Sequence, residues 1–152
     1  GNPSGINDGA AMVVLTRLST AEKNGWKPLA RLSAATSCGC DPKVMGEGPV
    51  HAIRRLLAKE GGALGDFDAL EINEAFAAQV LACATQLGFN AGEERFNRFG
   101  SGIALGHPIG ASGARLAVHL AHRIARGESR KALASLCVGG GMGIAAILES
   151  AE

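Results

Sequence analysis

The sequence contains no tyrosine, and aromatic residues make up only 4% of its 152 positions. Proteins that hold single-stranded nucleic acids stack the bases on aromatic side chains, so this scarcity argues against that class. The formal net charge of +1 provides no basic excess for nucleic-acid phosphates or for an anionic membrane surface. There is no run of about 18 apolar residues, so we expect no membrane-spanning helix. The composition therefore predicts neither a nucleic-acid partner nor a membrane partner.

The signs of a secreted or metal-binding protein are also missing. No secretory signal precedes the four cysteines, Cys38, Cys40, Cys83 and Cys137, which predicts a reducing, cytoplasmic location. Cys38 and Cys40 lack a second pair at a usable spacing, so we interpret both as free thiols and expect no metal. The chain opens on Gly1 with no methionine and no leading element, and we interpret it as a piece of a longer protein.

Glycine, in contrast, is abundant, with 22 residues, about twice the usual share. The glycines gather in residues 1–9, 46–48, 100–113 and 139–143. Glycine costs backbone entropy and is used where the backbone turns sharply or approaches something closely. Hydrophobic residues at 47% and charged residues at 19% are typical of a globular domain. The pattern predicts one domain in which several loops converge on a ligand.

Apolar runs and helical patterns alternate along the chain. The runs predict strands at residues 10–15, 29–35, 67–72, 131–138 and 143–148, with a hairpin turn at 139–141. The periodic segments predict helices at residues 19–24, 49–59, 74–87 and 112–125. This alternation predicts an α/β fold, in which helices cover a mixed five-stranded sheet. Ligands in such folds gather where loops leave the strand ends.

Three residues with useful chemistry lie at those places. Asn73 follows a strand, His107 precedes a helix within the glycine-rich residues 97–115, and Cys137 ends a strand directly before Gly139. Backbone N–H groups free to turn toward a ligand, beside a thiol, are the minimum for acyl chemistry, which needs a base or nucleophile and oxyanion donors. The imidazole is a candidate for proton transfer or oxyanion binding. Each residue also has a structural interpretation: Asn73 as a helix cap, His107 as part of a tight connection, and Cys137 as inert core.

The other three histidines are weaker candidates for a catalytic role. His51, His119 and His122 fall on predicted helices, and the last two share a face with Arg115 and Arg123, so we interpret them as solvated surface. Glu74 would sit in the first turn of its helix, where a carboxylate favours the helix dipole.

Five segments, taken together, closely resemble the thiolase family. They are residues 1–11, 41–46, 73–77, 106–115 and 137–143, and they follow the family's order over nearly the whole chain. The resemblance implies a thiolase-like fold built from two layered αβα halves. Residues 1–28 would end the N-terminal half, and residues 29–152 would form the C-terminal domain.

The resemblance also implies an acyltransferase that makes or cleaves 3-ketoacyl-CoA, with acyl-CoA and acetyl-CoA as substrates and no further cofactor. His107 would activate the family's acyl-accepting cysteine and help to form an oxyanion hole, in which Asn73 would hold the water. Cys137 would be the acid/base for the α-proton, and the amide of Gly139 would line a second oxyanion hole. The substrate contacts implied are Ser4 for the pantetheine arm, and Met45 and Phe76 for the acyl pocket.

One family feature is absent from the sequence. The acyl-accepting cysteine lies in the preceding half of the family's proteins, and Cys38, Cys40 and Cys83 lack its Ser/Gly-flanked setting. We therefore expect the missing N-terminal half as a partner, and a homodimer or homotetramer for the complete protein. The alternative is a truncated, inactive half-domain that binds acyl-CoA or pairs with a subunit. A ketoacyl-synthase relative is disfavoured, because a second histidine would be expected where Asn73 or Cys137 stands.

Overall fold

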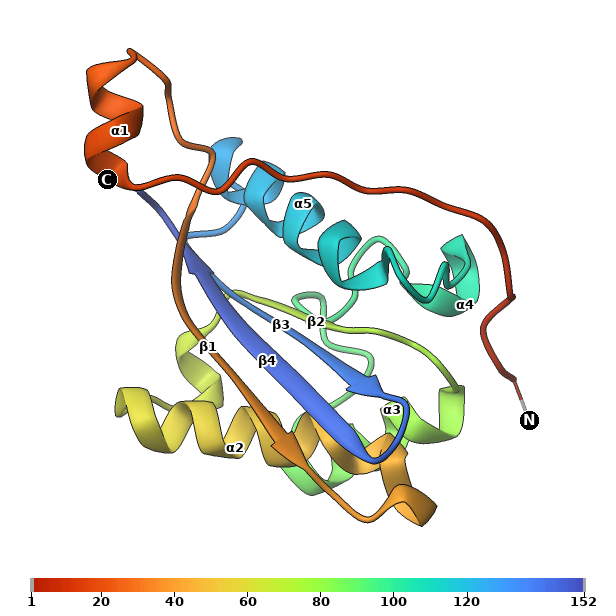
Figure 1. Cartoon of the computed structure of the whole chain (residues 1–152). Coiled ribbons are helices and arrows are strands. Elements are labelled where there is room, and N and C mark those ends of the chain that lie inside the picture. Colours follow the sequence, from red (N-terminus) through yellow and green to blue (C-terminus); the bar gives the residue numbers. More distant parts are fainter. Residues whose placement is uncertain (1, 152) are drawn as a thin grey trace.

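A four-stranded sheet forms the centre of the molecule (Figure 1). The computed structural model describes residues 2–151; Gly1 and Glu152, the outer ends of the two predicted domain ranges, lie outside it. The strand order is β1-β4-β3-β2. The strands are β1 (Arg31–Gly39), β2 (Ala69–Ile72), β3 (Lys131–Val138) and β4 (Met142–Glu149). Only β2 and β3 run parallel. The α/β class and the mixed sheet are confirmed, but the sheet has four strands rather than five.

The strand predicted at residues 10–15 is the one that is missing. Within the described chain, no hydrogen bond joins these residues to another segment. Met12 is 88% exposed and Val14 is 83% exposed. Figure 1 shows the segment as part of a long extended path that leads from the N-terminal end to α1 (Leu18–Lys23). A strand needs a neighbour for its N–H and C=O groups, so an apolar, β-branched composition alone did not produce one.

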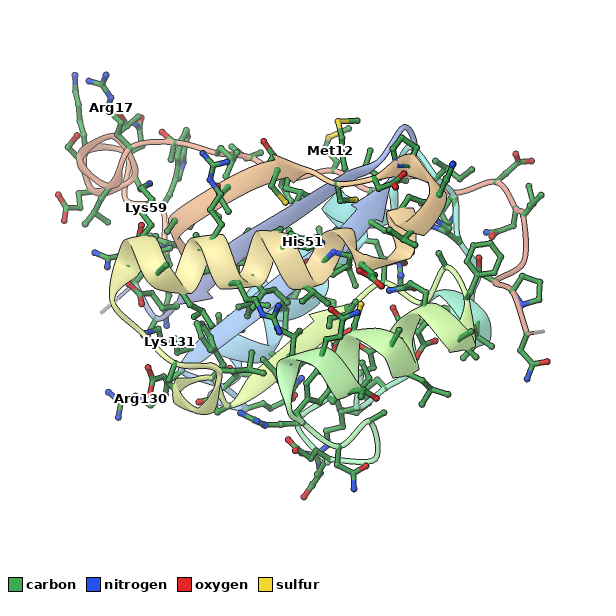
Figure 2. All side chains as sticks on the ribbon, turned by 90° about the horizontal axis from the view of Figure 1, so that it is seen from below. Met12, Arg17, His51, Lys59, Arg130 and Lys131 are labelled. Atoms are coloured by element: carbon green, nitrogen blue, oxygen red, sulfur yellow. The ribbon has the colours of Figure 1, made fainter. Side chains whose placement is uncertain are left out.

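Helices cover both faces of the sheet, as the layered prediction requires. α2 (Gly48–Glu60) and α3 (Ala77–Leu87) lie side by side on one face, and Figure 2 views the molecule from that side. α5 (Ser112–Ala125) lies on the other face. Successive side chains of a strand point to opposite faces. Leu133 accordingly joins the core under α2 and α3, whereas Ala132 and Ala134 join the core under α5.

The helix predictions agree with the structure for α2 and α5. α5 has the predicted bounds, and α2 ends at Gly61, whose φ of +74° is the left-handed conformation that glycine favours. α1 begins at Leu18 after Arg17, without the predicted capping box. β1 continues through residues 36–39, predicted as loop, because they pair with β4. The remaining elements are the 3₁₀ helices η1 (Pro42–Glu47) and η2 (Leu64–Asp66) and the short helix α4 (Gly102–Leu105).

The start of α2 meets the start of β4 backbone to backbone. A Cβ built on Gly143 would overlap the carbonyl group of Gly48, and a Cβ on Gly48 would overlap that of Met142. Neither neighbour is a flexible side chain that could move away. Because Gly143 pairs with Cys137 across the hairpin, this contact also fixes the end of β3.

We expect Gly143→Ala to lower the free energy of unfolding by about 2 to 3 kcal/mol, because the added methyl group has no room. Urea denaturation of the chain measures the change. Gly110→Ala is the matched control, since a Cβ at Gly110 meets no atom within 4 Å. Equal unfolding midpoints for the two variants would show that the contact is loose.

Candidate active site

The parallel strands β2 and β3 end at the same edge of the sheet. Ile72 pairs with Ser135, and the next residue, Asn73, donates its backbone N–H to the carbonyl of Ser135 over 3.0 Å. Cys137 follows on β3 near that edge. The fold thus places Asn73 and Cys137 on neighbouring strand ends, as the alternation of strands and helices predicts.

The N-terminal segment ties this edge to the loop that carries His107. The N–H of Ser4 donates to the carbonyl of Ala75 over 2.9 Å, and the N–H of Ala77 donates to Asn2 over 3.0 Å. The N–H of His107 donates to Gly5 over 3.1 Å. The N–H of Ala75 bonds back to the carbonyl of Asn73 over 3.1 Å. Residues 73–76 thus stay outside the helix, and α3 begins at Ala77 with Phe76 as its cap. The interpretation of Asn73 as a helix cap is therefore wrong.

The imidazole of His107 is held in one tautomer by Ser112. The Oγ of Ser112 donates its single proton to the carbonyl of Pro108 over 3.1 Å. The same Oγ lies 2.6 Å from Nδ1 of His107, so it accepts a hydrogen bond from the Nδ1–H group. Nε2 is then left with a free lone pair. Burial, together with the nearby cation of Arg115, lowers the pKa of His107 below 6.5, so the ring is neutral at pH 7.

Asn73 is fully buried beside this ring, at 0% exposure. Its Nδ2 lies 3.3 Å from Nε2 and 3.4 Å from Nδ1 of His107. Its Oδ1 accepts a hydrogen bond from Nη2 of Arg115 over 3.1 Å. The Asn73 amide is therefore held between a cation on one side and a neutral imidazole on the other.

Cys137 is half-buried and has no hydrogen bond to Asn73 or His107 in the described part of the chain. Burial raises the pKa of its thiol above 9.0, so the group is protonated at neutral pH. Of the two forms that the implied acid/base role uses, these surroundings favour the acid, the thiol, at rest; the base form requires a thiolate. The following turn exposes Gly139, while Gly140 and Gly141 take φ values of +87° and +83°.

The three substrate-contact candidates divide into two groups. Pro3, next to Ser4, forms a bridge with Phe76, which is 46% exposed at the start of α3. Met45 lies apart in η1, which packs on α3; there the carbonyl of Gly46 accepts from the thiol of Cys83 over 3.4 Å. A surface cavity of about 410 Å³ adjoins the His107 loop and is lined by residues 7–11 and 108–111.

Comparison with known proteins identifies the family. Residues 26–150 match the family model described as "Thiolase, C-terminal domain". The chain belongs to the thiolase family.

Its thiolase relatives extend well beyond it. An acetyl-CoA acetyltransferase of Chromobacterium violaceum is 51% identical over 149 residues, which are 98% of this chain but 38% of that protein. The crystal structure of the Bacillus anthracis acetyl-CoA acetyltransferase superposes with a TM-score of 0.92 at 50% identity, covering 97% of this chain and 37% of the other. The crystal structure of human mitochondrial 3-ketoacyl-CoA thiolase in complex with CoA gives a TM-score of 0.83 at 44% identity, covering 89% of this chain and 34% of the other. The chain spans about 38% of the length of the first of these relatives.

The thiolase chain also buries charges that sequence reasoning placed in solvent. Arg123 is 1% exposed, and its Nη1 lies 3.9 Å from the carboxylate of buried Glu71. His119 is partly buried, with Nε2 3.4 Å from the same carboxylate. Arg115, His119 and Arg123 follow one another at a spacing of four on α5 and form a stripe that faces β2. Glu71 and Asn73 alternate along an otherwise apolar strand, and this was the signal that could have revealed their partners. His51 and His122 are exposed, as predicted.

The prediction that Glu74 lies in the first turn of a helix is also wrong. Because α3 starts later, Glu74 is not in its first turn. Its Oε1 accepts from the amide of Asn97 over 3.0 Å, and its Oε2 accepts from the N–H of Ile103 over 3.1 Å. Asn97, with φ of 41°, also exchanges two hydrogen bonds with the backbone of Ile72. Glu74 thus connects the end of β2 to the loop that leads to His107.

Proposed function

We propose that this chain supplies the His107, Asn73 and Cys137 part of a thiolase active site that makes or cleaves 3-ketoacyl-CoA. The acyl-accepting cysteine would come from the N-terminal half, outside this chain. The observation that carries the proposal is the Asn73–His107–Ser112 arrangement, in which a partly buried, neutral imidazole is fixed in one tautomer. Such a group can accept a proton from a thiol and then donate a hydrogen bond.

In this mechanism, His107 acts first. The lone pair on Nε2 takes the proton of the acyl-accepting cysteine, and the resulting thiolate attacks the 3-keto carbon. The new Nε2–H, with a water held by Asn73, then donates to the thioester oxygen where enolate charge develops. A single donor fixed at such a position contributes about 3 to 4 kcal/mol to the barrier reduction.

Cys137 completes the cleavage step. Breaking the bond between the α and β carbons leaves an acyl-enzyme and an acetyl-CoA enolate. The Sγ proton of Cys137 moves to the enolate carbon, and in condensation the same sulfur takes that proton back. The raised pKa of Cys137 means that the resting group holds the proton required for cleavage. The thiol of CoA then attacks the acyl-enzyme carbonyl, to which the amide of Gly139 would donate. The CoA thiol gives its proton to the Cys137 thiolate, and the proton on Nε2 of His107 returns to the departing cysteine sulfur.

The remaining parts of the proposal concern substrate and partner. Ser4 would contact the pantetheine arm, and Met45 and Phe76 would line the acyl pocket. No metal or prosthetic group is needed for this chemistry. Apolar side chains stand exposed along the N-terminal segment and on β4, and they would meet the N-terminal half in a complete, oligomeric and cytoplasmic enzyme. Within residues 2–151, no helix is long and apolar enough to cross a membrane.

The second candidate is an inactive half-domain that binds acyl-CoA or pairs with a subunit. To separate the two, the part of the Chromobacterium violaceum acetyl-CoA acetyltransferase that precedes the match is joined ahead of residues 1–152. We call this protein the chimaera. We expect acetoacetyl-CoA thiolysis from the chimaera and none from the isolated chain. A chimaera that folds without turnover would favour the inactive half-domain, and turnover by the isolated chain that Cys38→Ser or Cys40→Ser abolishes would refute the missing nucleophile.

A further inference from the structure

Arg115, in the first turn of α5, lies directly behind Asn73. Its Nη2 donates to Oδ1 of Asn73 over 3.1 Å and lies 3.4 Å from Oγ of Ser101. Asn73 and Ser101 are both fully buried. A guanidinium has donors and no acceptor. The atom that Asn73 turns toward Arg115 must therefore be its oxygen.

The orientation of the Asn73 amide decides whether it presents a hydrogen-bond donor or an acceptor to the site. The two ends of an asparagine amide have nearly the same shape, and a flip exchanges a donor for an acceptor. With Oδ1 held by Arg115, Nδ2 faces His107. A water that accepts from Nδ2 is polarised to donate onward, as an oxyanion requires. A flipped amide would present only an acceptor there.

Arg115 has no carboxylate partner within 4.0 Å among the described residues. None of the ion pairs found in that part of the chain includes Arg115, and its Nε is buried without a hydrogen-bond partner. Arg123, two turns later on the same stripe, has Glu71 and Glu128 within 4.0 Å. Arg115 is partly buried, and holding a cation there without a carboxylate partner costs solvation energy. The contacts of Arg115 are thus directed at the site and not at a core ion pair.

We propose that Arg115 is a positioning residue that fixes the amide of Asn73 with Nδ2 toward His107. Its catalytic consequence rests on the proposed function. The cation supports the same site in a second way, because it adds to burial in lowering the pKa of His107.

The test begins with NMR spectroscopy of the isotopically labelled 152-residue chain. NOEs between the Asn73 side-chain amide protons and the His107 ring report the amide orientation, and ring shifts report the His107 pKa. Arg115→Met is expected to lose the NOEs and to move the pKa up toward 6.5, stopping short because burial persists. Arg115→Gln is uncharged and can either donate to or accept from Asn73, so it should weaken the NOEs and raise the pKa. Arg115→Lys, a cation of shorter reach, should keep the low pKa.

Arg123→Met is the matched control, because it removes a buried arginine from the same stripe without touching Asn73. We expect it to lower stability and to leave both signals unchanged. Unchanged NOEs in Arg115→Met would overturn the proposal. If that variant does not fold, Arg115→Lys and Arg115→Gln decide, and an equal pKa and equal NOEs in both would overturn it as well.

Activity of the chimaera supplies the second readout. Arg115→Met should lower kcat by about tenfold to a hundredfold while KM stays within about threefold, and Arg115→Lys should recover part of kcat. Lost NOEs with an unchanged kcat would uphold the positioning by Arg115 and contradict the proposed role of Asn73. The two inferences can therefore fail separately.

Discussion

Replacing His107 with alanine in the chimaera is expected to lower kcat for acetoacetyl-CoA thiolysis by about 10³-fold to 10⁴-fold. The imidazole has two roles in the proposed mechanism, and a positioned general base alone contributes about 10²-fold to 10⁴-fold. Losing an oxyanion donor costs about a further 10²-fold to 10³-fold, although roles that share one group do not add fully. Steady-state thiolysis measures the change. His51→Ala, at an exposed position on α2, should leave the rate unaltered.

The pKa of His107 sets the acidic side of the pH profile of kcat/KM. Only neutral His107 can accept a proton, so kcat/KM falls as pH drops through its pKa. Because burial and Arg115 lower that pKa, the acidic limb should lie below pH 6.5. A loss within about tenfold for His107→Ala, or an acidic limb that does not move in Arg115→Met, would refute the proton-accepting role.

Local pattern and cap chemistry predicted the parts of the fold that depend on one segment. The apolar stripe of α5, with Leu116 and Leu120 buried against the sheet, specifies both the helix and its buried face. Gly61 and Gly127 end helices in left-handed conformations that few other residues adopt. These elements needed no knowledge of distant residues, and the sequence analysis placed them within a residue or two.

Elements that depend on a partner could not be predicted in this way. Residues 10–15 have strand composition but no neighbour in the described chain to pair with. Asn73 has the chemistry of a cap, yet residues 73–76 stay outside the helix, and the backbone there bonds to residues 2–4. The same limit applies to Arg123, because nothing local distinguishes a solvated arginine from one that faces Glu71 across the α5–sheet interface.

In the candidate site, too, some features depend on one segment and others depend on distant partners. Asn73, His107 and Cys137 could be selected from residue type and glycine context. The tautomer of His107 depends on Ser112 and Pro108, and the orientation of the Asn73 amide depends on Arg115 in a different element. A single sequence displays the reacting groups but not the contacts that set their proton positions. Those contacts emerge only when β2, the His107 loop and α5 pack together.

Replacing Cys137 with alanine is expected to suppress solvent deuterium exchange at the α-carbon of acetyl-CoA by about 10³-fold, within the range of a lost general base. Mass spectrometry of acetyl-CoA incubated with the chimaera in D₂O measures the exchange. Transfer of an acetyl group onto the chimaera, followed as released CoA, should fall far less, because the attacking thiol depends on His107. His107→Ala should suppress both reactions, since the imidazole also donates to the enolate oxygen.

The Cys137→Ser variant and the pH profile of thiolysis distinguish the acid/base chemistry of the Cys137 thiol from its effect on packing. Cys137→Ser keeps a hydrogen-bonding group of similar size but one that ionises far less readily, so exchange should stay lost, while Cys40→Ala should leave it intact. Thiolysis needs Cys137 protonated and therefore declines only as pH rises through its raised pKa, above 9.0. With His107 shifted the opposite way, the profile should show a plateau wider than 6.5 to 9.0. Exchange that survives in Cys137→Ser would mean that another group moves the α-proton.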